Sequence, residues 1–417
     1  MNSLAGRDWF EKPALKRIFT LLNADGGEVR IVGGAVRNAL MDLPVVDVDM
    51  ATTLTPDVVV TRAKAAGIKV VPTGIDHGTV TLVMDGEGYE VTTLRRDVET
   101  NGRHAQVAFG TDWQTDAERR DLTINALYAD EKGEIIDLIG GFPDIETRTV
   151  RFIGDATTRI AEDYLRILRF FRFFAHYGAG RPDADGLRAS ARAKDKLATL
   201  SAERVWSEVK KLLSARDPSR ALLWMRQSGV LSEILPETEK WGIDAIHGLV
   251  AAEQALGWAV DPLLRLAAIL PPDRDRLAAL AARLRLSKAE ASYLTHWASA
   301  PAADPEMKET ALDRLLYRQG VEGVKARLKL ALAAARADLS AGDAMHKVAR
   351  LSTLLTRAEK FRKPGFPLSG ADVMAAGVEA GPKVGEVLKS LEEKWIDVNF
   401  SLDRAALTAR LKDMLEN

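Results

Sequence analysis

The chain has 417 residues, 47% of them hydrophobic and 28% charged, which excludes a disordered or collagen-like protein and allows two to four domains. It has no cysteine, which excludes disulfides, thiolate nucleophiles and cysteine-bound zinc, and no apolar run approaches the roughly 20 residues that span a bilayer. With no apolar signal core near Met1, we expect a cytoplasmic protein without membrane contact. The formal charge is −1, but residues 148–226 hold 17 Lys and Arg against 9 Asp and Glu, which predicts a polyanionic partner.

Residues 1–142 have the pattern of a mixed α/β domain. Apolar residues at helical spacing predict helices over 10–22, 56–66 and 121–128. Short β-branched runs predict strands over 29–32, 45–49, 79–84, 89–94 and 135–138, with a hairpin turn at 85–88. After residue 143 the strand signal ends, and helices are expected over 161–177, 185–200, 202–213, 219–227 and onward to 415. The predicted fold class is α+β, with a mixed sheet and helices first and an all-α part after it.

Two segments of the first domain indicate phosphate and metal chemistry. Gly33 and Gly34 follow a predicted strand and open a helix with Arg37 in its first turns, a geometry that lets backbone N–H groups approach a phosphate. Asp47 and Asp49 lie two residues apart on a predicted strand, so their carboxylates should face the same side. Glu90, in another predicted strand, adds a third acid. Adjacent carboxylates repel unless a cation neutralises them, and hard oxygen ligands favour Mg²⁺.

Five ordered motifs give the chain a family resemblance. The segment 33–37 followed by 47–52 resembles the first motif of the class II tRNA nucleotidyltransferase and bacterial poly(A) polymerase family. Residues 119–126, 137–141, 162–169 and 201–208 are similar to the second, third, fourth and fifth motifs. Five motifs in the family's order are a very specific match.

This resemblance implies a template-independent enzyme in which the tRNA 3′-hydroxyl attacks the α-phosphate of CTP or ATP and pyrophosphate leaves. It implies a nucleotidyltransferase palm at 1–142, a helical neck at 143–227, a helical body at 228–300 and a helical tail at 301–417 that anchors the tRNA elbow. Corresponding positions make Asp47 and Asp49 the Mg²⁺ ligands and Glu90 the third catalytic carboxylate. Gly33, Gly34, Arg37 and Arg120 correspond to positions that bind the nucleotide.

The fourth motif suggests how bases are selected. Asp163 and Arg166 are three residues apart on the predicted helix 161–177, so they should share a face and orient each other. Together they offer acceptors and donors in one plane, which match the amino donor and ring-nitrogen acceptor of both cytosine and adenine. The pair would therefore select C and A without a template. Arg169 and Arg172 continue this stripe and match family positions that face the nucleotide phosphates.

Some features depart from the family or leave alternatives open. Asn38 stands where the family has Asp, Asp42 stands where Gly is common, and 95–106 corresponds to a loop that adjusts the pocket. The same motifs occur in poly(A) polymerases and in enzymes that add only A or only CC. Because 74–79 resembles the CCA-adding branch, CCA addition is the expected activity. An RNA-binding protein with an inactive palm would need an incomplete acid set, whereas all three acids are present.

Overall fold

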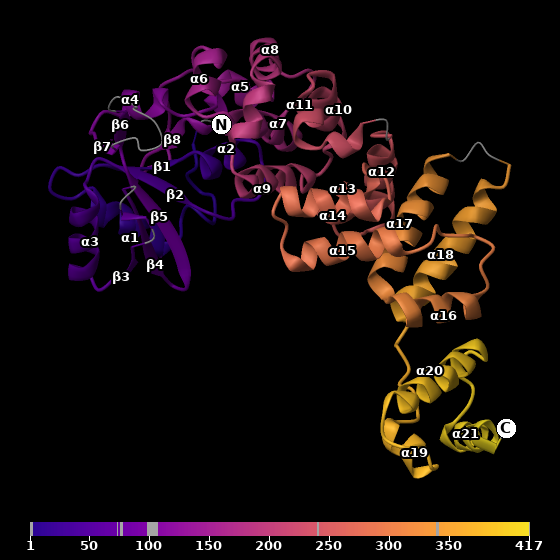
Figure 1. The fold of residues 1–417 in the computed structure, drawn as a ribbon. Coiled ribbons are helices and arrows are strands. Elements are labelled where there is room, and N and C mark those ends of the chain that lie inside the picture. Colours follow the sequence, from indigo (N-terminus) through magenta and orange to yellow (C-terminus); the bar gives the residue numbers. More distant parts are fainter. Residues whose placement is uncertain are drawn as a thin grey trace. The chain divides into compact units, whose positions relative to one another are not determined.

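The computed structural model describes residues 3–72, 74–75, 78–97, 107–239, 242–338 and 342–416. Most of the predicted loop 95–106 and part of the segment 74–79 lie outside these residues. The chain forms two compact units, Met1–Ile234 and Leu235–Asn417 (Figure 1). The finer division into palm, neck, body and tail stays a prediction.

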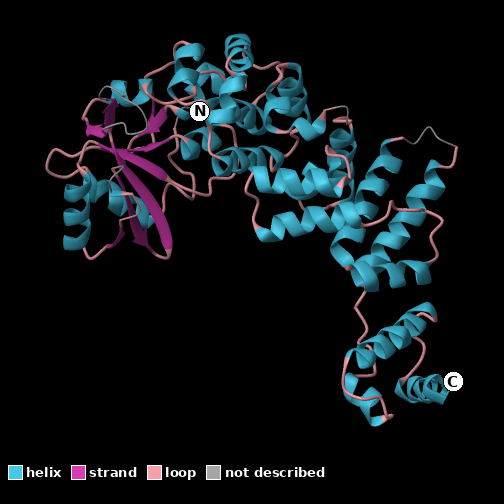
Figure 2. Cartoon of the chain, viewed as in Figure 1, coloured by secondary structure: helices cyan, strands magenta, loops and turns pink. Residues whose placement is uncertain are grey.

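The first unit contains a mixed sheet. Its described residues form seven strands in the order β3-β4-β5-β2-β1-β8-β9, in which β2 and β5 are parallel and the other neighbours antiparallel (Figure 2). A separate pair joins β6 to β7. The strands are β1 (Val29–Val32), β2 (Asp49–Thr52), β3 (Lys69–Val71), β4 (Thr79–Met84), β5 (Glu87–Thr93), β6 (Arg95–Asp97), β7 (Val107–Phe109), β8 (Leu127–Ala129) and β9 (Ile135–Asp137).

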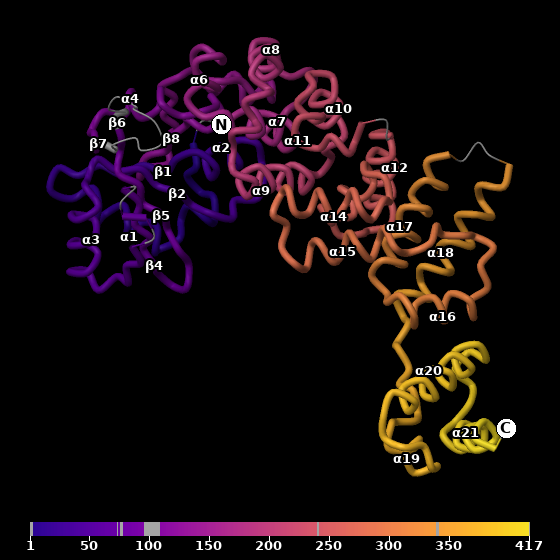
Figure 3. The backbone as a smooth tube through the Cα atoms, in the orientation of Figure 1, coloured from indigo at the N-terminus to yellow at the C-terminus, as the bar shows by residue number. Residues whose placement is uncertain are grey.

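Helices flank this sheet and continue the chain after β9, as the trace in Figure 3 shows. Those of the first unit are α1 (Pro13–Leu22), α2 (Gly34–Leu40), α3 (Pro56–Ala65), α4 (Trp113–Glu118), α5 (Phe142–Glu146), α6 (Ala156–Glu162), α7 (Leu165–Tyr177), α8 (Ala184–Arg192), α9 (Ala202–Leu213), α10 (Ser219–Gln227) and α11 (Val230–Ile234), with 3-10 turns η2 (Thr123–Asn125) and η3 (Lys194–Thr199).

In the second unit every described element is helical. These are η4 (Pro236–Thr238), α12 (Ala245–Leu256), α13 (Pro262–Ala268), α14 (Arg274–Arg283), α15 (Lys288–Ser299), α16 (Glu309–Gln319), α17 (Val321–Ala337), α18 (Ala344–Lys360), α19 (Gly370–Ala375), α20 (Pro382–Asp397) and α21 (Arg404–Glu416). A mixed sheet followed by helices confirms the predicted α+β class.

Three predicted elements of the first unit were wrong in ways that affect the site. The strand expected over 45–49 begins only at Asp49, because β1 ends at Val32 and its register pairs Ile31 with Met50. The helix expected over 121–128 is a 3-10 turn followed by β8, whose residues are fully buried between β1 and β9. The helix expected over 161–177 is two helices, α6 and α7, separated at Asp163.

An apolar cluster lies beneath the elements that hold the site. It joins β1, β2, α4 and β8 through the buried side chains of Val32, Ala51, Trp113, Ala117 and Tyr128. The rings of Trp113 and Tyr128 meet edge to face at 5.3 Å, which fixes α4 against β8. The short helix α4 is therefore anchored by burial, although six residues make too little helix to be stable alone.

Candidate active site

A cleft of about 630 Å³ opens in the first unit between the strands β2 and β5, the glycine turn before α2, and the start of α7. Most of the predicted site residues line it: Gly33, Gly34, Arg37, Asp49, Glu90, Arg120, Asp163, Arg166 and Arg169. Asp47 and Arg172 do not appear among the described residues of its wall. The cleft thus brings together residues that are up to 172 positions apart in the sequence, from Val32 to Arg204.

The acids of the cleft lie on neighbouring strands. Asp49 begins β2 and is paired with Glu90 of β5 in the parallel register. Asp47 lies two residues before β2 in an exposed segment, so it does not occupy a strand position as predicted. Partial desolvation by the cleft wall raises the pKa of Asp49, and the charges of Glu90 and Asp47 raise it further, while Arg120 lowers it. The cleft wall therefore concentrates negative charge at this edge of the sheet.

The chemistry of these acids fits a divalent cation. Within the described residues none of the three carboxylate groups has a hydrogen-bond or ion-pair partner, so their oxygens can act as ligands. A cation between them would also relieve the repulsion that raises the pKa of Asp49. Within the described ranges no group of three acids or histidines is assembled as a metal cage. Mg²⁺ commonly uses one or two carboxylates together with water and phosphate oxygens, which this arrangement allows.

The glycine turn and Arg37 form another part of the cleft wall, directly after β1, which is the neighbour of β2 in the sheet. Gly33 has φ = 70°, a conformation that favours glycine, and it leads directly into α2. Arg37 is 6% exposed and donates to Asn125 Oδ1, to the Tyr177 hydroxyl at 2.7 Å and to Asn38 Oδ1 at 2.9 Å. These acceptors are all neutral, so the guanidinium charge remains available to an anion in the cleft. Burial lowers the pKa of Arg37, as expected for a cation removed from water.

The two departures from the family pattern have visible local roles. Asn38 accepts from Arg37 through Oδ1 and donates through Nδ2 to the Pro44 carbonyl at 2.9 Å. An aspartate could accept from Arg37 but could not donate to Pro44. Asp42 has φ = 53°, a left-handed conformation in which Gly is common and which Asp tolerates better than most residues. Both residues shape the turn between Arg37 and Asp47.

The second motif connects the glycine turn to α7. A Cβ atom built on Gly33 would lie 4.0 Å from Arg120 Nη1, so this guanidinium reaches the glycine turn. The next residue, Asp121, accepts from Arg169 Nε at 2.6 Å. Burial opposes ionisation of Asp121, but Arg169 outweighs it, and the net effect lowers the pKa of Asp121. Arg169 is therefore held at the cleft wall by Asp121, which lies just before η2.

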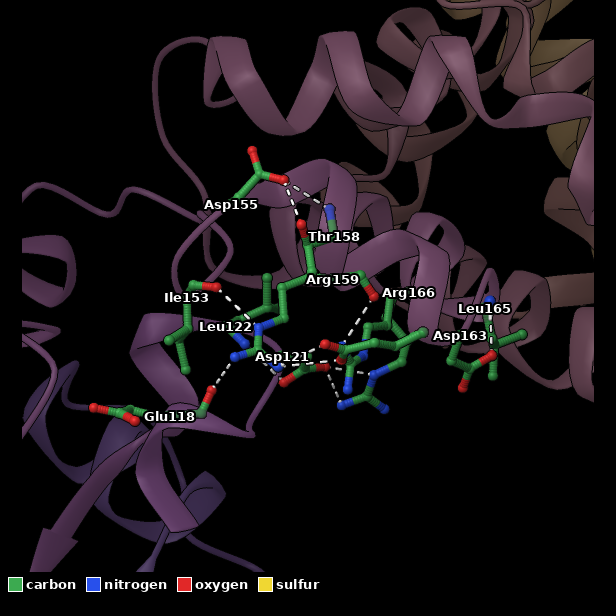
Figure 4. A network of polar contacts seen from close by, with 12 residues as sticks. Glu118, Asp121, Leu122, Ile153, Asp155, Thr158, Arg159, Asp163, Leu165 and Arg166 are labelled. Carbon is green, nitrogen blue, oxygen red and sulfur yellow. Dashed lines mark hydrogen bonds and ion pairs between the residues drawn. The ribbon is translucent and has the colours of Figure 1, made fainter. Parts of the chain in front are cut away.

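The Asp163 and Arg166 side chains line the same cleft, but each bonds to other neighbours and not to the other (Figure 4). The two residues are linked through the backbone, where the Arg166 N–H donates to the Asp163 carbonyl at 3.0 Å. Asp163 ends α6 with φ = −154° and ψ = 108°, outside helical geometry. Its carboxylate accepts from the Leu165 N–H at 3.0 Å and from Arg204 Nη2 at 2.7 Å. Arg166, in α7, pairs instead with Glu162 and donates to the Arg159 carbonyl at 2.9 Å. The prediction of one shared helix face was wrong, because the backbone turns at Asp163.

The remaining predicted residue, Arg172, is engaged outside the cleft wall. Its Nε donates to Glu208 Oε2 at 2.5 Å, and both side chains are largely buried between α7 and α9. A role at the nucleotide phosphates therefore stays a prediction for Arg172.

Sequence reasoning did not nominate several residues that line the cleft, among them Arg119, Asn125, Phe173 and Arg204. Arg119, Asn125 and Arg204 belong to the second and fifth motifs, so their position in a motif could have marked them. Phe173 has no such signal. Its ring lies within 5.4 Å of the guanidinium carbons of three arginines, Arg37, Arg169 and Arg172, and separates these like charges.

None of the helices in the described part of the chain is both long enough and apolar enough to cross a membrane.

Comparison with known proteins gives a consistent picture. Residues 29–151 match the family model of the poly A polymerase head domain, and residues 183–241 match the model described as a probable RNA and SrmB-binding site of polymerase A. The mouse (Mus musculus) mitochondrial CCA tRNA nucleotidyltransferase 1 is 33% identical over 95% of this chain and 89% of its own length. The CCA-adding enzyme of Streptococcus gordonii is 32% identical over 96% of both chains. The crystal structure of the Bacillus stearothermophilus CCA-adding enzyme in complex with CTP superposes with a TM-score of 0.78 and 27% identity, covering 97% of this chain and 98% of that one.

Proposed function

This chain belongs to the family of CCA-adding tRNA nucleotidyltransferases, and we propose that it adds C and A from CTP and ATP to the 3′ end of tRNA without a template. The observation that supports this most strongly is the cleft itself. It brings together the acids Asp49 and Glu90, the glycine turn beside them, and Asp163 and Arg166 from the junction of α6 and α7. The acids and the glycine turn are suited to bind a triphosphate with its metal ion, and Asp163 and Arg166 are suited to bind one nucleobase.

The proposed reaction is a nucleotidyl transfer. The terminal 3′-oxygen of tRNA forms a bond to the α-phosphorus of the nucleotide, the bond from that phosphorus to the bridging oxygen breaks, and pyrophosphate leaves. The proton of the hydroxyl group is lost to solvent. Gly33, Gly34, Arg37 and Arg120 are proposed to hold the triphosphate through N–H donors and positive charge.

The family depends on divalent metal ions, and we propose Mg²⁺ for this chain, held by Asp47 and Asp49 with Glu90 beside them. When bound, such ions would stabilise the negative charge on the attacking and leaving oxygens. Asp47 would need to turn toward the cleft, since it lies outside the wall in the present arrangement. Residues 45–48 belong to no helix or strand, and the Asp47 side chain is exposed, which leaves it room for such a rotation.

Base selection is assigned to Asp163 and Arg166. Each is oriented by its own neighbour, Asp163 by Arg204 and Arg166 by Glu162. A carboxylate acceptor and a guanidinium donor can then pair with C or A, while U and G present the opposite pattern at the corresponding edge. Arg169 and Arg172 are proposed to act on the phosphates, Arg172 only after release from Glu208.

The tRNA is proposed to bind along the basic region 148–226 and to be anchored by the tail at 301–417. The cytoplasm is the proposed compartment, based on the cysteine-free sequence; the mouse relative is named as mitochondrial, so cell fractionation would decide between the two.

One experiment tests the activity. The purified protein is incubated with Mg²⁺, tRNA that lacks its 3′ CCA, and labelled CTP or ATP, and the products are separated at single-nucleotide resolution. We expect two C additions followed by one A. A long A tail would instead indicate a poly(A) polymerase, a single A or CC would indicate a partial activity, and no extension would leave an RNA-binding protein.

A further inference from the structure

Beside the cleft lies a buried acid that no motif assignment includes. Asp116, in α4, is 1% exposed, and its carboxylate accepts hydrogen bonds from three side chains. Arg119 donates to Oδ1 through Nε at 2.9 Å and Nη2 at 2.6 Å. Arg120 donates to Oδ2 through Nε at 3.2 Å and Nη2 at 3.0 Å. The Tyr128 hydroxyl donates to the same oxygen at 2.9 Å.

This arrangement fixes the direction in which each arginine points. Both guanidiniums use the same edge, Nε and Nη2, on Asp116, which leaves Nη1 of each directed away from the acid. Arg120 is further held because its Nε donates to the Tyr128 hydroxyl at 3.1 Å. Its Nη1 is the atom that reaches Gly33, and its charge acts on Asp49. The edge of Arg120 opposite Asp116 therefore faces the place proposed for the triphosphate.

The cluster of Asp116, Arg119 and Arg120 extends from the buried core to the wall of the cleft, as the exposure of its side chains shows. Asp116 is almost completely buried, whereas Arg119 and Arg120 are both 22% exposed and both line the cleft. Burial would raise the pKa of Asp116, but Arg120 and Arg119 outweigh it, and the pKa is lowered. The acid thus stays ionised, and two cations share one anion. The cluster presents a net positive charge to the cleft, which suits a triphosphate.

We propose that Asp116 is a positioning residue for nucleotide transfer, which with Tyr128 aims Arg120 at the nucleotide phosphates and holds Arg119 on the same wall. This inference rests on the proposed function, because it concerns the nucleotide of that reaction. Asp116 does not touch the nucleotide; it acts through Arg120.

The test measures KM and kcat for CTP and ATP in wild type, Asp116→Ala, Asp116→Asn, Tyr128→Phe, Arg120→Ala and the double variant Asp116→Ala/Arg120→Ala. We expect Asp116→Ala to raise KM by roughly 10-fold, about the effect of one charged hydrogen bond to the phosphates. Tyr128→Phe should raise it in the same direction by a smaller factor. In the Arg120→Ala background, Asp116→Ala should have a much smaller effect on kcat/KM than in wild type, since the main group it positions is gone and only Arg119 remains to be displaced.

Asp144→Asn is the matched control. Asp144 is also a fully buried acid paired with an arginine, Arg151, but neither residue lines the cleft. Its substitution should lower thermal stability and leave KM for CTP near the wild-type value. If Asp116→Ala does not fold, Asp116→Asn and Tyr128→Phe give the same comparison with the hydrogen-bonding framework largely kept.

The outcomes separate this inference from the proposed function. An inactive wild-type protein would reject the proposed function, and direct CTP binding to the same variants would then decide the role of Asp116. An active wild type with unchanged KM in Asp116→Ala, or an equal loss with and without Arg120, would reject the positioning role. Loss of stability without a change in KM would show that Asp116 is a structural acid alone.

Discussion

Replacing Asp163 by alanine distinguishes a role in base selection from a role in stability. We expect a small loss of unfolding free energy and a larger, nucleotide-specific loss of kcat/KM. The Asp163 and Arg204 side chains are 36% and 49% exposed, and ion pairs of that exposure contribute less than about 1 kcal/mol. The hydrogen bond to the Leu165 N–H resembles a helix cap and adds roughly 1 kcal/mol. The variant should therefore lose no more than about 2 kcal/mol of unfolding free energy.

The effect on the reaction should be larger and selective. A charged hydrogen bond to a base amino group contributes about 1.5–3 kcal/mol, so kcat/KM for CTP and ATP should fall by about 10- to 150-fold. UTP and GTP do not form this bond, and their incorporation should fall less. The ratio between correct and incorrect nucleotides should therefore shrink, as it should for Arg166→Ala.

The assay is competitive incorporation of all four nucleotides on one tRNA primer, with chemical denaturation of the same samples. Asp185→Ala is the control, since Asp185 forms an exposed ion pair with Arg188 in α8, away from the cleft. It should leave the ratio unchanged. Equal losses for all four nucleotides in Asp163→Ala would refute the reasoning and leave these residues with a role in shaping the pocket.

Four further predictions follow from the site. Asp47→Ala and Asp49→Ala should abolish nucleotide incorporation, and Glu90→Ala should greatly reduce it. The binding of tRNA in a filter assay should stay near the wild-type level, because the fold does not depend on these unpaired carboxylates. Activity in either aspartate variant would exclude metal binding by that residue. Gly33→Ala should cost about 1–3 kcal/mol of stability and raise KM for CTP, because φ = 70° strains any side chain; a neutral result in calorimetry would contradict this. The affinity for tRNA should decrease steeply with salt, and a flat salt titration would argue against the basic region as the binding surface. Asp121 has a lowered pKa, so its ionised form stabilises the fold above the unfolded pKa of about 4, and this contribution is lost as pH falls further, through the folded value. The difference in unfolding free energy between wild type and Asp121→Asn should therefore be constant near neutral pH and narrow only below about pH 4, and a difference that stays constant in acid would disprove this contribution.

Local patterns predicted the elements that depend on local contacts. The strand at Thr79–Met84 and the helices Ala202–Leu213 and Ser219–Gln227 have the bounds that their periodicity indicated. The second motif also located one cleft residue, Arg120, correctly. In each case the apolar period, the turn signal or the motif lies within the element itself.

Elements that depend on distant partners could not be predicted in this way. Residues 121–128 have apolar spacing compatible with a helix, yet Leu127–Ala129 form a buried strand because β1 and β9 bond to both of its edges. The same strand places the Tyr128 hydroxyl on Asp116. Reading 121–128 as a helix therefore also concealed the cluster that orients Arg120.

The junction between α6 and α7 shows how a correct motif can accompany a wrong geometry. The helical period of apolar residues runs through 161–177 without interruption, and an aspartate at position 163 is compatible with that pattern. Asp163 instead bonds its own carboxylate to the Leu165 N–H, a use of Asp typical of helix starts, and the backbone leaves the helix there. Asp163 and Arg166 are consequently not fixed relative to each other by one rigid helix. Their relative position depends on Arg204 from α9 and Glu162 from the end of α6. If Asp163 and Arg166 select the base as proposed, the position of the edge that reads it is set by how α6, α7 and α9 pack.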